Sequence, residues 1–316
     1  MQAVILAAGR GKRLHPVTAN RTKAMAPILG QPIIWRVMQP LIEQGIQDFV
    51  IVTSPEDQEL RSYCAGLPLP DVVVQLVTQP EPLGMGHALL QAAPYITGDF
   101  LLSSCDNLVA EADLARLLNL WRSSPNSRAI LTALQVGPAD LVRMGVLKLD
   151  GERVIGIVEK PTLETAPSRI GSIPLYIFSH QFLTYLAQIR PSPRGEYELQ
   201  DAIQELIDRD GQVRALMLAE RIDLTTPQDL LRINLKFLES EQPRHNMARE
   251  IGTGSRLVEP YFIQPEVVIR ENCKIGPNVF IEKGAQLGDG VQIENCIVLR
   301  DRIVATQTKA FDQVIW

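Results

Sequence analysis

A glycine-rich segment near the N-terminus, Leu6 to Pro16, carries residue types that suit phosphate binding. It follows a short apolar run, Ala3 to Ala7, and precedes a helical pattern from Ile33 to Ile42. α/β proteins bind phosphates at the carboxyl ends of strands, where glycines allow a tight turn and let backbone N–H groups approach phosphate oxygens. The segment also holds basic side chains, so its chemistry would be the binding of a polyphosphate.

Two well-known phosphate loops do not fit this segment. A Rossmann fingerprint requires a third glycine at position 14, which is Leu14 here. A Walker A loop requires Gly-Lys-Ser/Thr after four spacer residues, and Gly11-Lys12-Arg13 does not supply it. For the short segment taken alone, a simple turn with solvated charges remains the alternative.

A longer string that begins in this segment is more specific. Gly-x-Gly-x-Arg-Leu-x-Pro-x-Thr over residues 9–18, followed by Lys23 and Pro27, resembles the signature of the sugar nucleotidyltransferases, also called nucleotide-sugar pyrophosphorylases. The resemblance covers roughly residues 1–240. Five further segments follow in the order expected for that family: Gln79 to Ala88, Asp106 to Leu108, Glu159 to Pro161, Gly195 to Asp201 and Asp223 to Pro227.

The resemblance implies a reaction and a set of site residues. An oxygen of a sugar-1-phosphate would attack the α-phosphorus of a nucleoside triphosphate, and a nucleotide-sugar and pyrophosphate would form. A phosphate monoester loses its second proton near pH ~6, so the site needs charge neutralisation and alignment rather than a general base. By resemblance the residues are Arg13 and Lys23 as catalytic groups; Leu6, Ala8, Gly9, Gly11, Gln79 and Gly84 for the nucleotide; Gly145, Glu159 and Lys160 for the sugar phosphate; and Asp106 and Asp223 as ligands of an Mg²⁺ cofactor.

Gln79 and Gly84 are expected to set the choice of base. A glutamine amide both donates and accepts, which suits a pyrimidine edge, and a bare glycine lets the base approach closely. Gly84-Met-Gly-His-Ala88 resembles the form found in bacterial glucose-1-phosphate uridylyltransferases, which favours UTP, then dTTP, with glucose-1-phosphate as the default acceptor. Ser172-Ile173-Pro174 departs from the family pattern before Tyr176, so an unusual sugar-1-phosphate stays open.

The elements that must position these residues alternate over the first two thirds of the chain. Alternating strands and helices predict a doubly wound, mostly parallel, Rossmann-like α/β sheet that is covered on both faces. Buried-strand runs occupy residues 3–7, 49–53, 72–77, 100–104 and 129–134. Helical patterns occupy residues 33–42, 86–93, 114–122, 199–208 and 228–238, and a hairpin occupies 145–149 and 154–158.

A repeat of period six begins at Ile251 and continues to Leu299, with an aliphatic residue leading each of nine hexads. Small or apolar residues recur four positions after the leaders from Val267 onward. This pattern is typical of a parallel β-helix and resembles the left-handed β-helix of hexapeptide-repeat proteins, with about three coils. A hexapeptide acyltransferase is an alternative, but all four histidines precede the repeat and the catalytic histidine of that class has no counterpart.

Length and composition limit the function classes. The chain has 316 residues and a formal net charge of −5, and no apolar run is long enough to span a bilayer, so neither a nucleic-acid nor a membrane partner is expected. The start is not expected to be a signal peptide, and four scattered cysteines favour a reduced, cytoplasmic protein.

The expected organisation is a catalytic domain over residues 1–240, a linker over 241–250, the left-handed β-helix over 251–304 and a tail over 305–316. The flat faces of the coil stack favour a homo-oligomer. Besides the enzyme, a regulatory or binding subunit that has lost catalysis remains an alternative, although Arg13, Lys23, Asp106 and Asp223 are all present.

Overall fold

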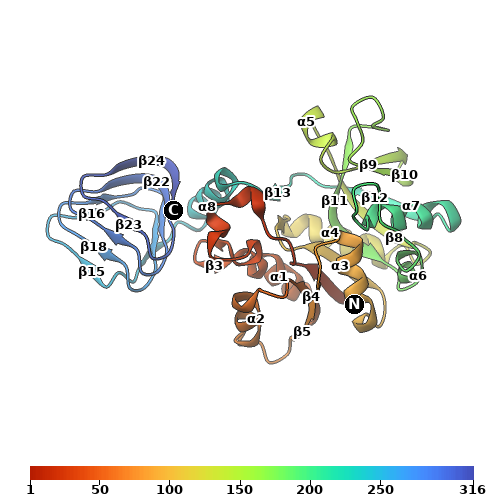
Figure 1. Cartoon of the computed structure of the whole chain (residues 1–316), viewed down its shortest axis with the longest axis horizontal. Helices are drawn as coiled ribbons and strands as arrows, with labels where there is room; N and C mark the ends of the chain where they lie inside the picture. The colour runs from red at the N-terminus through yellow and green to blue at the C-terminus, as the bar shows by residue number, and fades with distance from the viewer. The chain divides into compact units, whose positions relative to one another are not determined.

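A computed structural model describes all 316 residues as two compact units (Figure 1). Unit 1 comprises Met1–Arg10 and Val37–Ile222, and unit 2 comprises Gly11–Arg36 and Asp223–Trp316. The segment Gly11–Arg36 therefore belongs with the C-terminal residues rather than with the sheet that precedes and follows it.

Unit 1 is built on a nine-stranded sheet with the order β5-β4-β1-β6-β11-β8-β12-β10-β9. Strands β1, β4, β5 and β6 run parallel, as do β8 and β12, whereas β11 is antiparallel to both β6 and β8. The mostly parallel sheet expected from the sequence is thus present. The strands are β1 (Gln2–Leu6), β4 (Asp48–Thr53), β5 (Val73–Thr78), β6 (Phe100–Ser104), β8 (Ala129–Gln135), β9 (Gly145–Asp150), β10 (Arg153–Glu159), β11 (Ile170–Phe178) and β12 (Val213–Met217).

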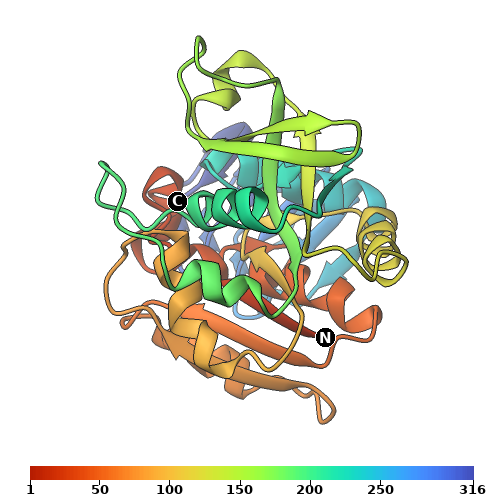
Figure 2. The same ribbon diagram turned by 90° about the vertical axis from the view of Figure 1, so that its right-hand side faces the viewer.

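Helices cover the sheet because its central strands are apolar on both faces. All five residues of β1 are buried, and Val4 and Leu6 belong to a core that also contains residues of α3, α6 and α7. These three helices lie together against one face (Figure 2). The unit's helices are α2 (Gln58–Ala65), α3 (Met85–Ala92), α4 (Glu111–Arg122), α5 (Pro138–Leu141), α6 (Phe182–Leu186) and α7 (Leu199–Arg209), with the 3-10 turn η4 (Ala93–Tyr95).

β11 is the central strand that the apolar runs did not predict. Pro174 lies inside it, and the register with β8 shifts between Ile173 and Tyr176. Proline cannot donate a ladder hydrogen bond, so it is tolerated at such an irregularity. The hairpin of β9 and β10 is present, but its turn residues are Gly151 and Glu152, because Asp150 still pairs with Arg153 in the ladder.

Unit 2 begins with the short elements of the segment Gly11–Arg36 and continues with the long helix α8. α8 starts at a capping box, in which Thr226 and Asp229 satisfy each other's backbone N–H groups. Its elements are η1 (Lys12–Leu14), η2 (Val17–Ala19), η3 (Lys23–Met25), β2 (Pro27–Ile28), β3 (Gln31–Pro32) and α8 (Pro227–Glu241). β7 (Asn107–Leu108) belongs to unit 1. The unit boundaries fall in the sequence within α1 (Ile33–Glu43), which contains Pro40, and within β13 (Ile222–Asp223).

The rest of unit 2 is a stack of short parallel strands. Paired residues are 18 apart in the first coils, as for Tyr261 and Val279, and 17 apart in the last, as for Val279 and Cys296. The first coils therefore each have the length of three hexads, and the last coil is one residue shorter. The strands are β14 (Arg244–Asn246), β15 (Glu250–Ile251), β16 (Arg256–Leu257), β17 (Tyr261–Ile263), β18 (Val268–Ile269), β19 (Lys274–Ile275), β20 (Val279–Ile281), β21 (Gln286–Leu287), β22 (Gln292–Val298), β23 (Ile303–Val304) and β24 (Lys309–Ile315).

The stack extends beyond the expected boundaries at both ends. Residues 241–250 were expected as a linker, but β14 pairs with β17 and β15 pairs with β18. Residues 305–316 were expected as a tail, but β24 pairs with β22 over Lys309–Ile315. The hexad leaders did not reveal these end strands, because end coils are covered on one side only and carry more exposed residues.

Candidate active site

The glycine-rich segment leaves unit 1 at the carboxyl end of a parallel strand. Leu6 ends β1, Ala8 is buried, and Gly9 is exposed with no atom within 4 Å of the place where a Cβ would lie. The carbonyl of Leu6 accepts a hydrogen bond from the backbone N–H of Cys105 at 3.1 Å, which brings the turn at Asp106 to the end of β1. Three predicted nucleotide-binding residues and one predicted metal ligand therefore share this edge of the sheet.

The predicted base-binding pair is in direct contact. Nε2 of Gln79 donates to the carbonyl of Gly84 at 3.1 Å and lies 3.1 Å from Nδ1 of His87. The side chain of Gln79 is held in one orientation by these two partners, and residue 79 is buried. His87 lies in the first turn of α3, and its ring lies 5.7 Å from that of Tyr197.

Glycine is the only residue type that fits the backbone conformation and the packing at position 84. Its φ is +98°, and a Cβ there would lie 2.8 Å from the carbonyl oxygen of Tyr197. The backbone of Tyr197 also donates to Leu83 and accepts from Gly86, both at 2.8 Å. The segment around Tyr197 thus supports the base-binding turn, a contact that sequence spacing could not reveal.

The predicted sugar-phosphate residues also come together, on the β9–β10 hairpin. Glu159 pairs with Gly145 across the ladder, and a Cβ on Gly145 would lie 3.3 Å from Oε2 of Glu159. That Oε2 atom is buried and has no hydrogen-bond partner, whereas Oε1 lies 3.3 Å from Nζ of Lys160. Burial raises the pKa of Glu159, although the ammonium of Lys160 opposes the shift. The site therefore holds an unsatisfied acceptor, which a ligand hydroxyl would satisfy.

Polar groups not identified from the sequence surround this acceptor. Gln200, near the start of α7, has side-chain atoms 3.2 and 3.3 Å from the same Cβ position on Gly145, and residue 200 is buried. On β11, the hydroxyls of Ser172 and Tyr176 are 2.7 Å apart. Burial raises the pKa of Tyr176, so its phenol stays protonated and can donate.

Asp106 lies in the turn after β6, beside an unusual neighbour. Asn107 is only 3% exposed, and both polar atoms of its side chain are buried without a partner. Buried side-chain amides normally have hydrogen-bond partners, so the side chain of Asn107 is available to bind a polar ligand or an ion. Carboxylate and amide oxygens are hard ligands of the kind that Mg²⁺ prefers, and Asp106 next to Asn107 fits such an ion.

In unit 2, the remaining predicted residues lie on two segments. Gly11 has a φ of +61° and precedes η1, which carries the exposed side chain of Arg13. A Cβ on Gly11 would lie 3.1 Å from Cβ of Lys23, so the two catalytic candidates are held on one packed loop. Asp223 accepts a hydrogen bond from Oγ1 of Thr225 at 2.9 Å, just ahead of α8.

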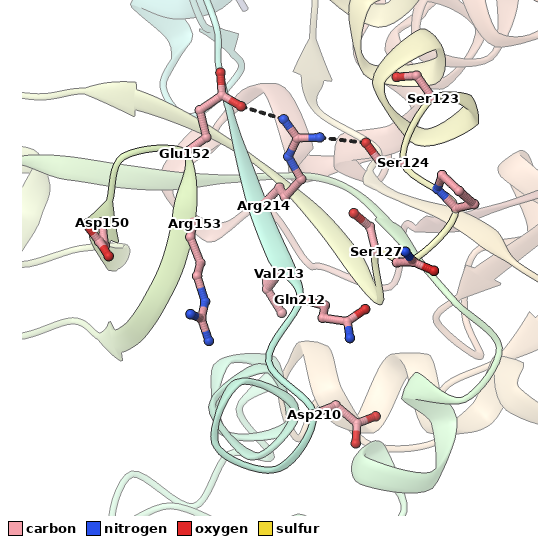
Figure 3. A pocket seen from close by; sticks show the side chains of 12 residues that line it. Ser123, Ser124, Ser127, Asp150, Glu152, Arg153, Asp210, Gln212, Val213 and Arg214 are labelled. Atoms are coloured by element: carbon pink, nitrogen blue, oxygen red, sulfur yellow. Dashed lines mark hydrogen bonds and ion pairs between the residues drawn. The ribbon is translucent and has the colours of Figure 1, made fainter.

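A cavity of unit 1, of about 920 Å³, involves none of the predicted residues (Figure 3). Arg214 crosses it, donating to Ser124 at 2.6 Å and to Glu152. Three carboxylates and two guanidinium groups line it: Asp150, Glu152, Asp210, Arg153 and Arg214. This mixed lining lacks the surplus of positive charge that a phosphorylated ligand would need.

Comparison with known proteins decides the family. A model described as Nucleotidyl transferase matches residues 2–240, and a model described as GMPPB C-terminal domain matches residues 257–315. This chain belongs to the nucleotidyl transferase family. No helix in it is both long and apolar enough to cross a membrane.

The related proteins are sugar-1-phosphate nucleotidyltransferases. The chain is 32% identical to the bifunctional protein GlmU of Methanococcus vannielii over 249 residues, which are 77% of this chain but 56% of that protein. It is 27% identical to a glucose-1-phosphate thymidylyltransferase of Streptomyces griseus, covering 88% of this chain and 77% of that one. Among solved structures, UDP-glucose pyrophosphorylase from Acinetobacter baumannii superposes with a TM-score of 0.67 at 26% identity, covering 77% and 94%. The chain thus spans little more than half the length of its GlmU relatives.

Proposed function

We propose that this nucleotidyl transferase moves a nucleotidyl group, with Mg²⁺, from a nucleoside triphosphate to a sugar-1-phosphate, releasing pyrophosphate. The observation that carries the proposal is the buried, unpartnered Oε2 of Glu159 beside Gly145. A buried acceptor without a donor is costly, so its persistence favours a ligand that supplies a hydroxyl. A sugar offers several such hydroxyls, and Lys160 beside Glu159 offers a cation for its phosphate.

UTP or dTTP is the proposed nucleotide. Nε2 of Gln79 is engaged by Gly84 and His87, which leaves the amide oxygen to accept a hydrogen bond from the base. Uracil and thymine carry an N–H donor at N3, whereas cytosine presents an acceptor there. The fixed orientation of Gln79 therefore supports a uracil or thymine base over cytosine.

Glucose-1-phosphate is the proposed default acceptor. Glu159, Gln200 and the Ser172–Tyr176 pair supply acceptors and donors for sugar hydroxyls. Pro174 has no N–H to offer a sugar at the same strand. Discrimination between sugars would therefore depend on side chains rather than on the β11 backbone.

The chain's own residues would act by neutralising charge and by alignment. The backbone at Leu6, Ala8, Gly9 and Gly11 would approach the triphosphate, and Lys160 would hold the sugar phosphate. Arg13 and Lys23 would stabilise the charge that develops as pyrophosphate leaves. Mg²⁺, held by Asp106 and Asp223, would neutralise phosphate charge when bound.

We further infer a left-handed winding of the coils and a cytoplasmic homo-oligomer. Three hexads per coil and short strands are the supporting observations for the winding. Four buried, free cysteines support a reducing compartment. Light scattering coupled to gel filtration would measure the oligomeric state, and a monomer at micromolar concentration would contradict that part.

Pyrophosphate release with Mg²⁺ tests the reaction. UTP, dTTP, GTP, ATP and CTP would each be offered with several sugar-1-phosphates, with Asp106→Asn as the matched inactive variant. Turnover with one uracil or thymine nucleotide is the expected result. Turnover that Asp106→Asn leaves unchanged would overturn the metal assignment. If no combination of nucleotide and sugar-1-phosphate releases pyrophosphate while the protein still binds nucleotide, the non-catalytic subunit would be favoured.

A further inference from the structure

We propose that Arg21 and Glu282 are positioning residues for nucleotidyl transfer, because their ion pair fixes the segment Gly11–Arg36 on the coil stack within unit 2. That segment carries Arg13 and Lys23. The inference rests on the reaction proposed above, and it assigns to the coil stack a direct part in ordering the triphosphate-binding loop.

The ion pair is bidentate and buried. Nη1 of Arg21 lies 2.7 Å from Oε1 of Glu282, and Nη2 lies 2.9 Å from Oε2, across 261 residues of sequence. Residues 21 and 282 are only 8% and 6% exposed. Two parallel hydrogen bonds between planar groups fix direction as well as distance, so residue 21 has one defined position on the stack.

The coil stack holds its side of the pair rigidly. Glu282 directly follows β20, whose residues are all buried, and its backbone N–H donates to Val298 at 2.9 Å. The backbone N–H of Arg300 donates to Oε2 of Glu282 at 2.9 Å. The guanidinium of Arg300 also donates to the carbonyl of Asn20 at 2.6 Å, which adds a second bond next to Arg21.

A second anchor holds the segment after Lys23. Asn234 of α8 accepts from the backbone N–H of Leu29 at 2.7 Å and donates to the carbonyl of Pro27 at 3.0 Å. Gly30 packs so closely on Phe262 that a Cβ there would lie 2.7 Å from the ring. Lys23 therefore lies between two fixed points, and the Arg21 anchor is only two residues away.

Local contacts couple the position of Arg21 to the positions of Lys23 and Arg13. Lys23 opens η3, where the backbone N–H of Ala26 donates back to Lys23 at 3.0 Å. Gly11 packs against the side chain of Lys23, and Thr18 donates to the carbonyl of Gly11 at 3.1 Å. Arg13 follows Gly11 by two residues. A shift at Arg21 would thus displace Lys23 and Arg13 together, and a displacement of about 1 Å can cost about 10²-fold in rate.

Stability alone does not account for this pair. Desolvation of two charges offsets much of their attraction, and apolar replacements of buried ion pairs are often neutral or stabilising. Nε of Arg21 is also buried without a partner. Unlike an apolar contact, the ion pair fixes the orientation of the two side chains. A loop that carries catalytic residues needs this fixed orientation.

The experiment compares steady-state kinetics and hydrogen exchange of full-length variants at a temperature where each is folded. For Glu282→Gln and Arg21→Met, we expect kcat/KM for the nucleotide to fall by about tenfold or more while the KM for the sugar phosphate stays unchanged. Arg21→Lys, which keeps the charge but loses the fork, should fall between these variants and the wild type. Amide exchange in residues 11–36 should accelerate, and this readout does not require turnover.

Two control variants separate positioning from stability. Val279→Ala removes apolar volume from the same coil, and Glu250→Gln breaks an exposed ion pair with Arg270. Both should keep the wild-type kcat/KM for the nucleotide and wild-type amide exchange in residues 11–36. If a single variant does not fold, the double variant Arg21→Met, Glu282→Met supplies the same readouts with apolar packing retained.

Unchanged kcat/KM for the nucleotide and unchanged amide exchange in the ion-pair variants would overturn the proposal. A loss of activity that merely follows the melting temperature, as in Val279→Ala, would also overturn it. A wild-type chain that turns over no substrate would refute the proposed reaction instead, and the exchange data would then still decide whether the ion pair orders the segment.

Discussion

Glu159 and Gly145 face each other across the β9–β10 ladder, so that a Cβ on residue 145 would lie 3.3 Å from the unpartnered Oε2 of Glu159. The space that a side chain at residue 145 would fill therefore lies next to the Oε2 atom of Glu159, which has no hydrogen-bond partner. Gln200 borders the same volume. A ligand group that enters there meets a carboxylate oxygen without displacing another protein donor.

Gly145→Ala tests whether that volume receives the sugar. The added methyl group would fill the space next to Glu159, so the KM for the sugar phosphate should rise by about tenfold or more while the KM for the nucleotide stays unchanged. Gly156→Ala on the same hairpin is the matched control, because its Cβ would meet only ordinary contacts at 3.6 Å. Equal kinetics of the two variants would contradict the assignment of Gly145.

Glu159→Gln should separate function from stability. A hydrogen bond to a charged acceptor contributes about 1.5–3 kcal/mol, so kcat/KM for the sugar phosphate should fall by about 10- to 100-fold. Because the pKa of Glu159 is raised in the folded state, the folded chain binds more protons than the unfolded one above pH 4.5, and stability falls as the pH rises through this window. The melting temperature of Glu159→Gln relative to wild type should therefore increase from pH 4 towards neutrality.

The exposed pair formed by Glu205 and Arg209 provides the control for this measurement. Glu205→Gln should show no such pH-dependent gain, since exposed pairs contribute little. A pH-independent difference between Glu159→Gln and wild type would mean that the carboxylate is not destabilised by burial.

Gln79→Leu tests the choice of base. The variant keeps approximate size but removes the amide oxygen proposed to accept from N3–H, and so kcat/KM with the preferred nucleotide should fall by about 10-fold or more. The ratio of kcat/KM for UTP to that for CTP should shrink as well. Gln91→Leu, which alters another glutamine that contacts His87, is the matched control. An unchanged ratio would show that Gln79 does not select the base.

Gly84→Ala should destabilise unit 1 and weaken nucleotide binding together. A left-handed φ of +98° and a 2.8 Å approach to the carbonyl oxygen of Tyr197 leave no room for a methyl group. The cost should be about 1–3 kcal/mol in urea unfolding. Gly98→Ala adds a methyl group in open space and should be neutral. Two variants of equal stability would contradict the close packing at Gly84.

Much of the fold was predictable because its signals are local. The apolar runs that became β1, β4 and β6 are buried along their length. The hexad leaders from Ile263 to Ile293 are buried in one core, as inward-facing positions of a coil stack would be. The expected leader Leu299 is out of register, because Ile281 pairs with Val298. Ile251, in contrast, is 40% exposed, because β15 is the end strand of its face and no coil covers it from the other side.

The site was predictable only where a motif marks it. The motifs marked Gln79, Gly84, Glu159 and Gly145, and the structure brings Gln79 to Gly84 and Glu159 to Gly145. Gln200, Asn107 and Tyr197 lie inside matched segments, but no role was assigned to them. Their importance depends on contacts far along the chain or on missing hydrogen-bond partners, which residue spacing does not show. β11 was missed because Pro174 interrupts an otherwise strand-like run.

The assignment of Gly11–Arg36 to unit 2 has a consequence for how this protein can be recombined with its relatives. A cut near residue 240 looks like a natural crossover point, but it would separate Arg21 from Glu282 and Gly30 from Phe262. Chimeras that exchange only the residues after about 240 should therefore inherit a mismatched loop. A functional exchange would have to transfer two pieces of the gene at once, the codons for residues 11–36 together with those for residues 223–316.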